Sequence, residues 1–209
     1  MDPELLARLH PCVFHSTSES AWPSIQKFGL QSTLQLLDIF GVTEAQRTEL
    51  LSRPRRESVV LHADGLPAVV IRDQKPMKFI GEKIDPESSL QQYLDAINSR
   101  VFFWASRERL ERLRDAKEYR GQPQVILCVD TGRLIERYER AIQLCRFNSG
   151  AIMQKNHPTR GHRSWLSIAD YPYEEYERRY GRGKALAEVT VLDAVPDIED
   201  LLIDVEFVR

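Results

Sequence analysis

The stretch that decides the fold reads Cys12-Val13-Phe14-His15-Ser16-Thr17. Its apolar start predicts a buried strand, which delivers the imidazole of His15 and the hydroxyl of Thr17 to its end. Apolar residues then recur at helical spacing between positions 22 and 28, and Gly29 closes that helix. A strand that leads into a capped helix in this way is a junction that can bind a polar ligand.

The composition is typical of an ordinary globular domain. The chain has 209 residues, of which 42% are hydrophobic and 29% charged, so it can build a sizeable core under a solvated surface. We expect a single domain over residues 1–209. The formal net charge is −2, which excludes a protein that coats nucleic acid by charge alone but leaves room for a local basic groove.

The cysteines and the apolar runs indicate the compartment. Cys12, Cys128 and Cys145 lie within apolar runs and show no CxxC spacing, which predicts a reduced, intracellular chain without a zinc site. Residues 1–6 lack the basic and apolar pattern of a signal peptide, and no apolar run reaches membrane-spanning length. We therefore expect a cytoplasmic protein that does not contact membranes.

Helical and strand patterns intermix along the chain without repeats. Helices are predicted over residues 2–9, 44–52, 87–98, 106–118, 134–138 and around the tyrosines of 173–180. Strands are predicted over residues 59–61, 68–71, 100–104, 124–129, 187–192 and 203–208. This mixture predicts an α+β fold with a mostly antiparallel or mixed sheet and peripheral helices. The charge pairs of helix 106–118 are typical of a solvated helix face.

Several familiar motifs are missing, and one long loop stands out. The sequence contains neither GxxxxGK nor GxGxxG for phosphates, and neither GxSxG nor HExxH for hydrolysis. Residues 155–163 form a polar, basic, turn-rich stretch that predicts a surface loop. A loop of this kind inside a compact domain is more often functional than idle.

Glu188 is the most informative acidic residue. Strand alternation puts Ala187 and Val189 on one face and Glu188 with Thr190 on the other. Carboxylates are depleted within strands, so Glu188 either faces solvent or has a chemical task. Glu206 shows the same alternation, but we expect it on an edge strand near the end of the chain.

Three further candidates have a structural and a functional interpretation. His15 is either a core histidine bonded to a backbone carbonyl or a ligand contact. Arg72 ends an apolar run, so its guanidinium must reach water, an ion-pair partner or an anionic ligand. Phe103 and its aromatic neighbours either fill the core or stack on a flat heterocycle at a cleft.

In combination, these patches resemble the ADP-ribosyltransferase superfamily, and most closely the DarT-type DNA ADP-ribosyltransferase toxins and their uncharacterised relatives. Residues 14–17 and 25–30 resemble the opening pattern HxT…NLxxILxxGL. Residues 100–104 (RVFFW) are similar to the aromatic strand of that family. Ala187-Glu188-Val189-Thr190-Val191, followed by Val195-Pro196-Asp197-Ile198, resembles its C-terminal AExLV…VP…I pattern, which holds the catalytic glutamate.

The resemblance implies a split, twisted sheet with NAD in a central cleft between its parts. Glu188 would contact the ribose that carries the scissile bond, because a fixed carboxylate stabilises the oxocarbenium-like state of glycosidic cleavage. Arg72 would pair with the pyrophosphate. The other expected cofactor contacts are His15 and Thr17 at the nicotinamide side, the ring of Phe103, and Asn148, which is also a candidate for the acceptor side.

The resemblance further implies an NAD-dependent ADP-ribosyltransferase that uses NAD as co-substrate without a metal and modifies DNA or RNA as a toxin or phage-defence effector. The expected substrate contacts are Arg160, His162 and Arg163, with the basic residues of 178–184 beside them. Residues 41–98 depart from the DarT pattern and are expected to be a family-specific insertion. Without a basic groove at the loop 155–163 and residues 178–184, a protein side chain or a small molecule is an equal candidate for the acceptor. Two alternatives stay open: a non-catalytic nucleotide-binding domain of the same fold, and an NAD-using RNA 2′-phosphotransferase. An antitoxin or regulatory partner also stays open.

Overall fold

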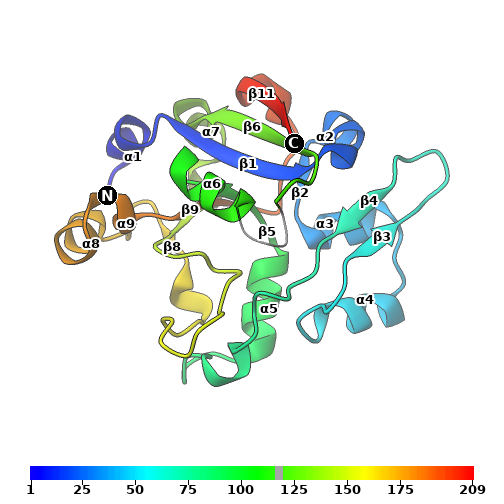
Figure 1. Cartoon of the computed structure of the whole chain (residues 1–209), viewed down its shortest axis with the longest axis horizontal. Helices are drawn as coiled ribbons and strands as arrows, with labels where there is room; N and C mark the ends of the chain where they lie inside the picture. Colours follow the sequence, from blue (N-terminus) through cyan, green and yellow to red (C-terminus); the bar gives the residue numbers. More distant parts are fainter. Residues whose placement is uncertain (116–119) are drawn as a thin grey trace.

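An antiparallel sheet forms the centre of the computed structural model, which describes residues 1–115 and 120–209 (Figure 1). The strands are β1 (Cys12–Ser18), β2 (Leu30–Gln31), β3 (Val59–Leu61), β4 (Val69–Ile71), β5 (Arg100–Trp104), β6 (Gln124–Asp130), β7 (Ile142–Cys145), β8 (Leu166–Ser167), β9 (Glu188–Leu192), β10 (Ala194–Val195) and β11 (Leu202–Val208). Seven of them form the central sheet in the order β11-β6-β1-β5-β9-β7-β8, and β10-β2 and β3-β4 form separate pairs. The predicted α+β class and antiparallel sheet are confirmed.

Helices cover this sheet on both sides. In the described residues they are α1 (Pro3–Leu9), α2 (Trp22–Phe28), α3 (Thr33–Ile39), α4 (Glu44–Leu51), α5 (Leu90–Asn98), α6 (Arg107–Arg114), α7 (Thr131–Tyr138), α8 (Tyr173–Tyr180) and α9 (Arg182–Ala185). The capping box predicted at the start of α4 is present, with Thr43 and Gln46 bonded reciprocally. The helix predicted over 106–118 is α6, and its predicted last residues, 116–118, lie outside the described residues.

The two faces of the sheet carry different cores. On one face Val13, Leu127 and Val189 belong to the main core, which also includes Leu6 of α1 and Leu134 of α7. On the other face α5 supplies a second cluster that includes the buried Cys145 of β7. A sheet that is covered on both faces buries consecutive residues of its central strands, which simple alternation does not reveal.

The middle of the sheet is joined by one residue pair. β1 and β6 pair at seven positions, whereas β1 and β5 pair only at Phe14 and Trp104. β5 and β9 pair at five positions, ending at Trp104 and Glu188. Glu188 is therefore two strands away from Phe14 in one row across the sheet. The row places their Cα atoms about 10 Å apart at the usual strand spacing.

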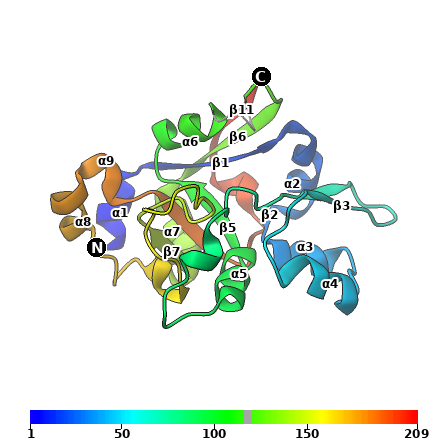
Figure 2. The ribbon, with the colours of Figure 1, turned by 60° about the horizontal axis from the view of Figure 1, so that its bottom comes forward.

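A third apolar cluster lies apart from the sheet. It contains Leu37 and Phe40 after the start of α3 together with Leu61, Val69 and Ile71 of the β3-β4 pair. Figures 1 and 2 show α3, α4, β3 and β4 as a small lobe on the side opposite α8 and α9. The segment predicted as an insertion thus has two parts, because its first half builds this lobe while α5 packs against the central sheet.

Gly29 closes α2 where the chain must pass close to another segment. Its φ is +69°, and a Cβ built there would lie 2.4 Å from the backbone of Pro196. Only glycine combines that conformation with that approach. Leu30 can then pair with Val195, which ties the start of the chain to its end.

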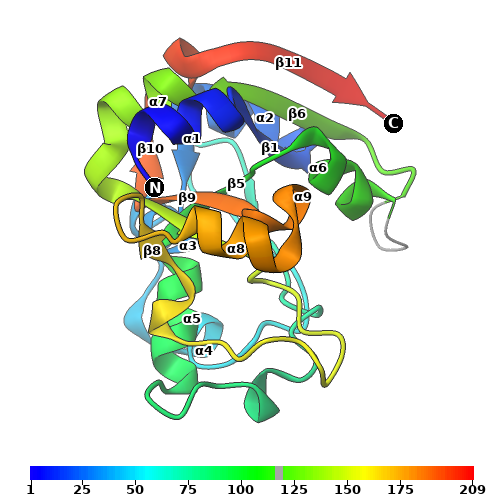
Figure 3. The same cartoon turned by 90° about the vertical axis from the view of Figure 1, so that its left-hand side faces the viewer.

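Two further expectations concern the edge of the sheet and the length of the helices. β11 lies at one edge of the sheet (Figure 3), so the prediction of an edge strand for Glu206 is confirmed. Within the described ranges, no helix has the length and apolar character needed to cross a bilayer.

Candidate active site on the central strands

Glu188 begins β9 in the interior of the protein. It pairs with Trp104 on one side and with Cys145 on the other, and only 4% of its surface is exposed. Thr190, on the same face, is fully buried and donates from Oγ1 to the carbonyl of Gln143. The interpretation of this face as solvent-exposed is therefore wrong, because other segments cover it.

The carboxylate of Glu188 is only half satisfied. Its Oε1 accepts a hydrogen bond of 2.9 Å from the backbone N–H of Ser149. Its Oε2 is buried and has no hydrogen-bond partner among the described residues, and the same holds for the hydroxyl of Ser149. Buried polar atoms are almost always paired, so this Oε2 marks Glu188 as a candidate functional carboxylate.

The environment of Glu188 raises its pKa toward neutral pH. Burial raises the pKa of Glu188 from 4.5 to about 7, although hydrogen bonding from Ser149 and the charges of Arg160 and Arg109 act in the opposite direction. A carboxyl with such a pKa can exchange a proton near physiological pH, which is a property of catalytic acids and bases.

This raised pKa makes stability depend on pH. Between pH 4.5 and about 7 the folded chain holds the Glu188 proton more tightly than the unfolded chain does, so the free energy of unfolding falls as pH rises through this window. We expect the wild type to lose about 3 kcal/mol relative to Glu188→Gln between pH 4.5 and pH 8, by urea denaturation at both pH values. Parallel pH profiles of the two proteins would contradict the raised pKa.

Arg160 is the structural neighbour of this carboxylate, not a surface residue. It is 1% exposed, and its guanidinium donates to the backbone carbonyls of Pro158, Asn148 and Ala151. Its charge also lies 4.0 Å from the ring centroid of Phe147. The prediction that Arg160 is a surface contact for substrate is wrong in this structure, because its side chain holds together residues 147–160.

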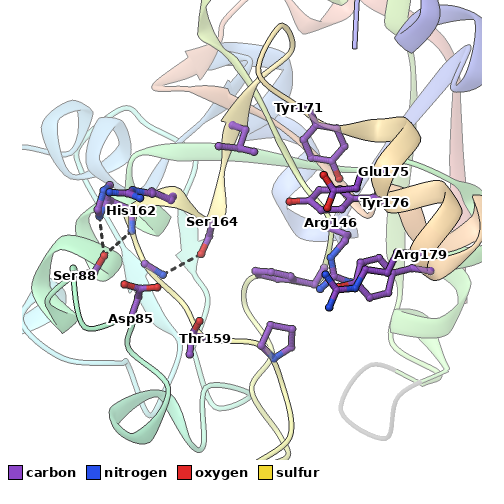
Figure 4. Close-up of a pocket in the computed structure, with 16 residues that line it drawn as sticks. Asp85, Ser88, Arg146, Thr159, His162, Ser164, Tyr171, Glu175, Tyr176 and Arg179 are labelled. Atoms are coloured by element: carbon purple, nitrogen blue, oxygen red, sulfur yellow. Dashed lines mark hydrogen bonds between the residues drawn. The ribbon is translucent and has the colours of Figure 1, made fainter.

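The other two predicted substrate contacts, His162 and Arg163, do reach the surface. His162 is exposed, and its Nδ1 lies 2.8 Å from the hydroxyl of Ser88. Arg163 forms an ion pair of 2.5 Å with Glu87. Both line a pocket of about 390 Å³ (Figure 4). Asn148 is half-buried and directly precedes the Ser149 amide that binds Glu188, so it lies beside the candidate site.

His15 lies where β1 and β5 part. Its Nδ1 is 2.9 Å from the carbonyl oxygen of Phe102, which can only accept, so Nδ1 carries the proton. Burial lowers the pKa of His15, with a further lowering by the charge of Arg72, while the bond to Phe102 raises it. The imidazole is therefore neutral at pH 7, and the structure brings Arg72 near to it.

Arg72 and Thr17 are the other two candidate residues near His15. Arg72 is exposed just after β4, and its carbonyl accepts a hydrogen bond from Nε of Arg55. Thr17 is half-buried on β1, on the same face as His15 by strand alternation. Arg72 is thus exposed to solvent and Thr17 partly so.

Phe103 does not reach any ligand surface. It is 1% exposed in the main core and contacts His15 edge to face, with 6.0 Å between the ring centroids. The prediction of Phe103 as a cofactor contact is wrong in this structure, because its side of β5 faces the core. Phe102 and Trp104, on the opposite side of β5, are half-buried.

The strand register separates His15 from Glu188. Paired residues of antiparallel strands project to the same face, so Phe14, Trp104 and Glu188 share one face. His15 follows Phe14 and projects to the other face with Leu127. The resemblance implies one cleft for both side chains, whereas the structure places them on opposite faces of the sheet.

Comparison with known proteins places the chain in a family. Residues 11–202 match a family described as being of unknown function, DUF7002. The chain belongs to the DUF7002 family. The matched region runs from the residue before β1 to the first residue of β11, so it includes His15, Arg72 and Glu188. No curated protein matches the sequence.

The sequence of this DUF7002 member does not indicate Ser149 as a site residue. Its contribution is a backbone N–H, which every non-proline residue has, so no residue type could indicate it. The turn-forming run Asn148-Ser149-Gly150 after β7 was the only available signal. In the described part of the chain, no group of three or more His, Cys, Asp or Glu side chains could hold a metal ion.

Proposed function

We propose that this protein is an NAD-dependent ADP-ribosyltransferase in which Glu188 is the catalytic carboxylate. The observation that carries the proposal is the state of this side chain: it is buried in the central strands, one oxygen is held by Ser149, and the other has no partner among the described residues. A carboxylate fixed in this way is preorganised to face a positive charge that develops beside it.

The chemistry follows from that position. When the bond between C1′ of the ribose and the nicotinamide nitrogen breaks, nicotinamide leaves with the electron pair and positive charge develops on the ribose. Ionised Glu188 stabilises this charge. The acceptor oxygen or nitrogen then bonds to C1′ and loses its proton, which Glu188 can take because its pKa is about 7.

The way the sheet is joined supports a split sheet of the kind that the resemblance implies. β1 and β5 share only the pair of Phe14 and Trp104, so the two halves of the sheet can diverge beyond it. Arg72, exposed near this point, is the cation that we assign to the pyrophosphate of NAD.

The opposite orientation of His15 and Glu188 refines the role of the histidine. In this proposal His15 does not contact the ribose that Glu188 serves. It holds the carbonyl of Phe102 and thereby the middle of β5 beside β1. Glu188 and the half-buried Trp104 of β5 face the other side.

The acceptor in this proposal is nucleic acid, as the resemblance implies. Exposed basic residues of α8 and α9 support it, and one of them, Arg179, lines the same pocket as His162 and Arg163. These basic residues are Arg178, Arg179, Arg182 and Lys184. They provide local positive charge on a chain whose net charge is −2.

The test uses NAD labelled on the adenylate phosphate, incubated with the protein and with single-stranded DNA, duplex DNA, RNA or lysate protein. We expect label to move to nucleic acid and free nicotinamide to form in equal amount. A rise in melting temperature with NAD but no nicotinamide would instead support the non-catalytic nucleotide-binding domain. Consumption of a 2′-phosphate from RNA would support the phosphotransferase, and the absence of every signal would refute the proposal.

A further inference from the structure

The pocket beside residues 158–166 has two chemically different walls (Figure 4). Its volume of about 390 Å³ lies in the range of pockets that bind small molecules. In Figure 4, Asp85, Ser88, Thr159, His162 and Ser164 lie on one side, and Arg146, Tyr171, Glu175, Tyr176 and Arg179 lie on the other. Glu188 does not line this pocket.

The wall formed by α8 and the end of β7 is a stack of rings and guanidinium groups. The guanidinium of Arg146 lies 4.0 Å from the ring centroid of Tyr180 and 5.7 Å from that of Tyr176. The guanidinium of Arg179 lies 5.2 Å from the same Tyr180 ring. This wall offers flat surfaces for stacking and cations directly beside them.

The two cations of this wall are available for an anion. Among the described residues, neither Arg146 nor Arg179 has a carboxylate within ion-pair distance, whereas Arg163 on the rim is paired with Glu87. Arg146 is half-buried, so its charge is screened less than that of a fully exposed arginine. An anionic group on the ligand can therefore pair with these guanidinium groups, which share the wall with the carboxylate of Glu175.

The opposite wall is polar and held in place. The Ser88 hydroxyl contacts Nδ1 of His162 at 2.8 Å and accepts from the His162 N–H at 3.0 Å. Gly161 permits this approach, since a Cβ there would lie 2.5 Å from Oγ of Ser88. Asp85 and Thr159 add hydrogen-bonding groups to this wall, which suit the edge of a heterocycle.

We infer that this pocket binds a nucleotide unit, with the base stacked on Tyr180 and Tyr176, the phosphate on Arg146 and Arg179, and the base edge toward Asp85. A planar, anionic ligand rich in hydrogen-bonding groups matches both walls. The unit is either a free mononucleotide or one nucleotide of a single strand. Binding at this pocket does not depend on the transferase proposal, because it needs neither NAD nor Glu188.

The test is titration calorimetry of the whole chain with AMP, GMP, CMP and UMP, with adenosine and inorganic phosphate for comparison. We expect at least one mononucleotide, or a short single-stranded oligonucleotide, to bind about tenfold or more tightly than either fragment. Mononucleotide binding identifies a small-molecule ligand, and binding of the oligonucleotide alone identifies a strand. Failure of all of them, or phosphate that binds as tightly as the nucleotides, would overturn the inference.

Variants of α8 locate the binding. Arg179→Ala and Tyr180→Ala should each weaken it about tenfold. The matched control is Arg178→Ala, an exposed neighbour on α8 that bonds to the carbonyl of Glu174 and does not line the pocket. An equal loss of affinity in Arg178→Ala would mean that binding depends on the overall positive charge of α8. This result would also overturn the assignment of the site. Should Tyr180→Ala fail to fold, Arg179→Ala decides, because Arg179 is exposed.

Glu188→Gln separates this inference from the transferase proposal. That variant should bind the nucleotide as the wild type does, because Glu188 is not part of the pocket. Loss of transfer with intact nucleotide binding supports both proposals, and intact transfer with no nucleotide binding refutes only the pocket.

Discussion

Glu188→Gln is expected to reduce ADP-ribosyl transfer and nicotinamide release about 1,000-fold, because it removes the negative charge that faces the developing oxocarbenium ion. Glutamine is isosteric and its amide oxygen can still accept from the Ser149 N–H, so the fold should persist. The measurement is label transfer from NAD, read together with the thermal unfolding of both proteins. Neutral glutamine also removes the cost of a buried charge, so the variant should be at least as stable as the wild type at pH 8.

Glu206→Gln is the matched control for that experiment. Glu206 is also a strand glutamate, but it lies on the edge strand β11 and pairs with Arg107 through two oxygens. Its side chain is 39% exposed, so its loss should leave transfer within about twofold. Equal activity of Glu188→Gln and wild type would refute the role of Glu188, and equal loss in both variants would point to a general effect on the fold.

Arg160→Ala is expected to lower the free energy of unfolding by about 4 kcal/mol, by urea denaturation. The substitution removes three hydrogen bonds to backbone carbonyls and the group that stacks on Phe147. It also takes away a positive charge that acts on Glu188, so the pKa of Glu188 should rise further.

Arg163→Ala provides the comparison for stability, because it lies three residues away in the same loop. Its ion pair with Glu87 joins side chains that are 73% and 63% exposed, so its removal should cost less than about 1 kcal/mol. If Arg160→Ala were as stable as Arg163→Ala, the buried guanidinium would not hold the loop together. A role of Arg160 in ligand binding would then explain the burial of its guanidinium better.

Local features of the sequence predicted most of the elements correctly. The capping box of Thr43 and Gln46 located α4, and β-branched runs located β3, β4 and β6. These signals are local, because a cap or a run of branched side chains acts within a few residues. Glu188 could also be singled out, since a carboxylate inside an apolar strand is unusual wherever the strand lies.

The sequence by itself thus determined the α+β class, the positions of the strands and the candidate status of Glu188. Only the tertiary structure decided that Glu188 is buried, that Arg160 turns inward and that His15 faces away from Glu188. Each of these depends on contacts between distant segments: the Ser149 amide above β9, the carbonyls around Arg160, and the register of β1 with β5 and β9. Alternation along one strand specifies two faces, but the pairing of strands and the segments that cover them decide what each face meets.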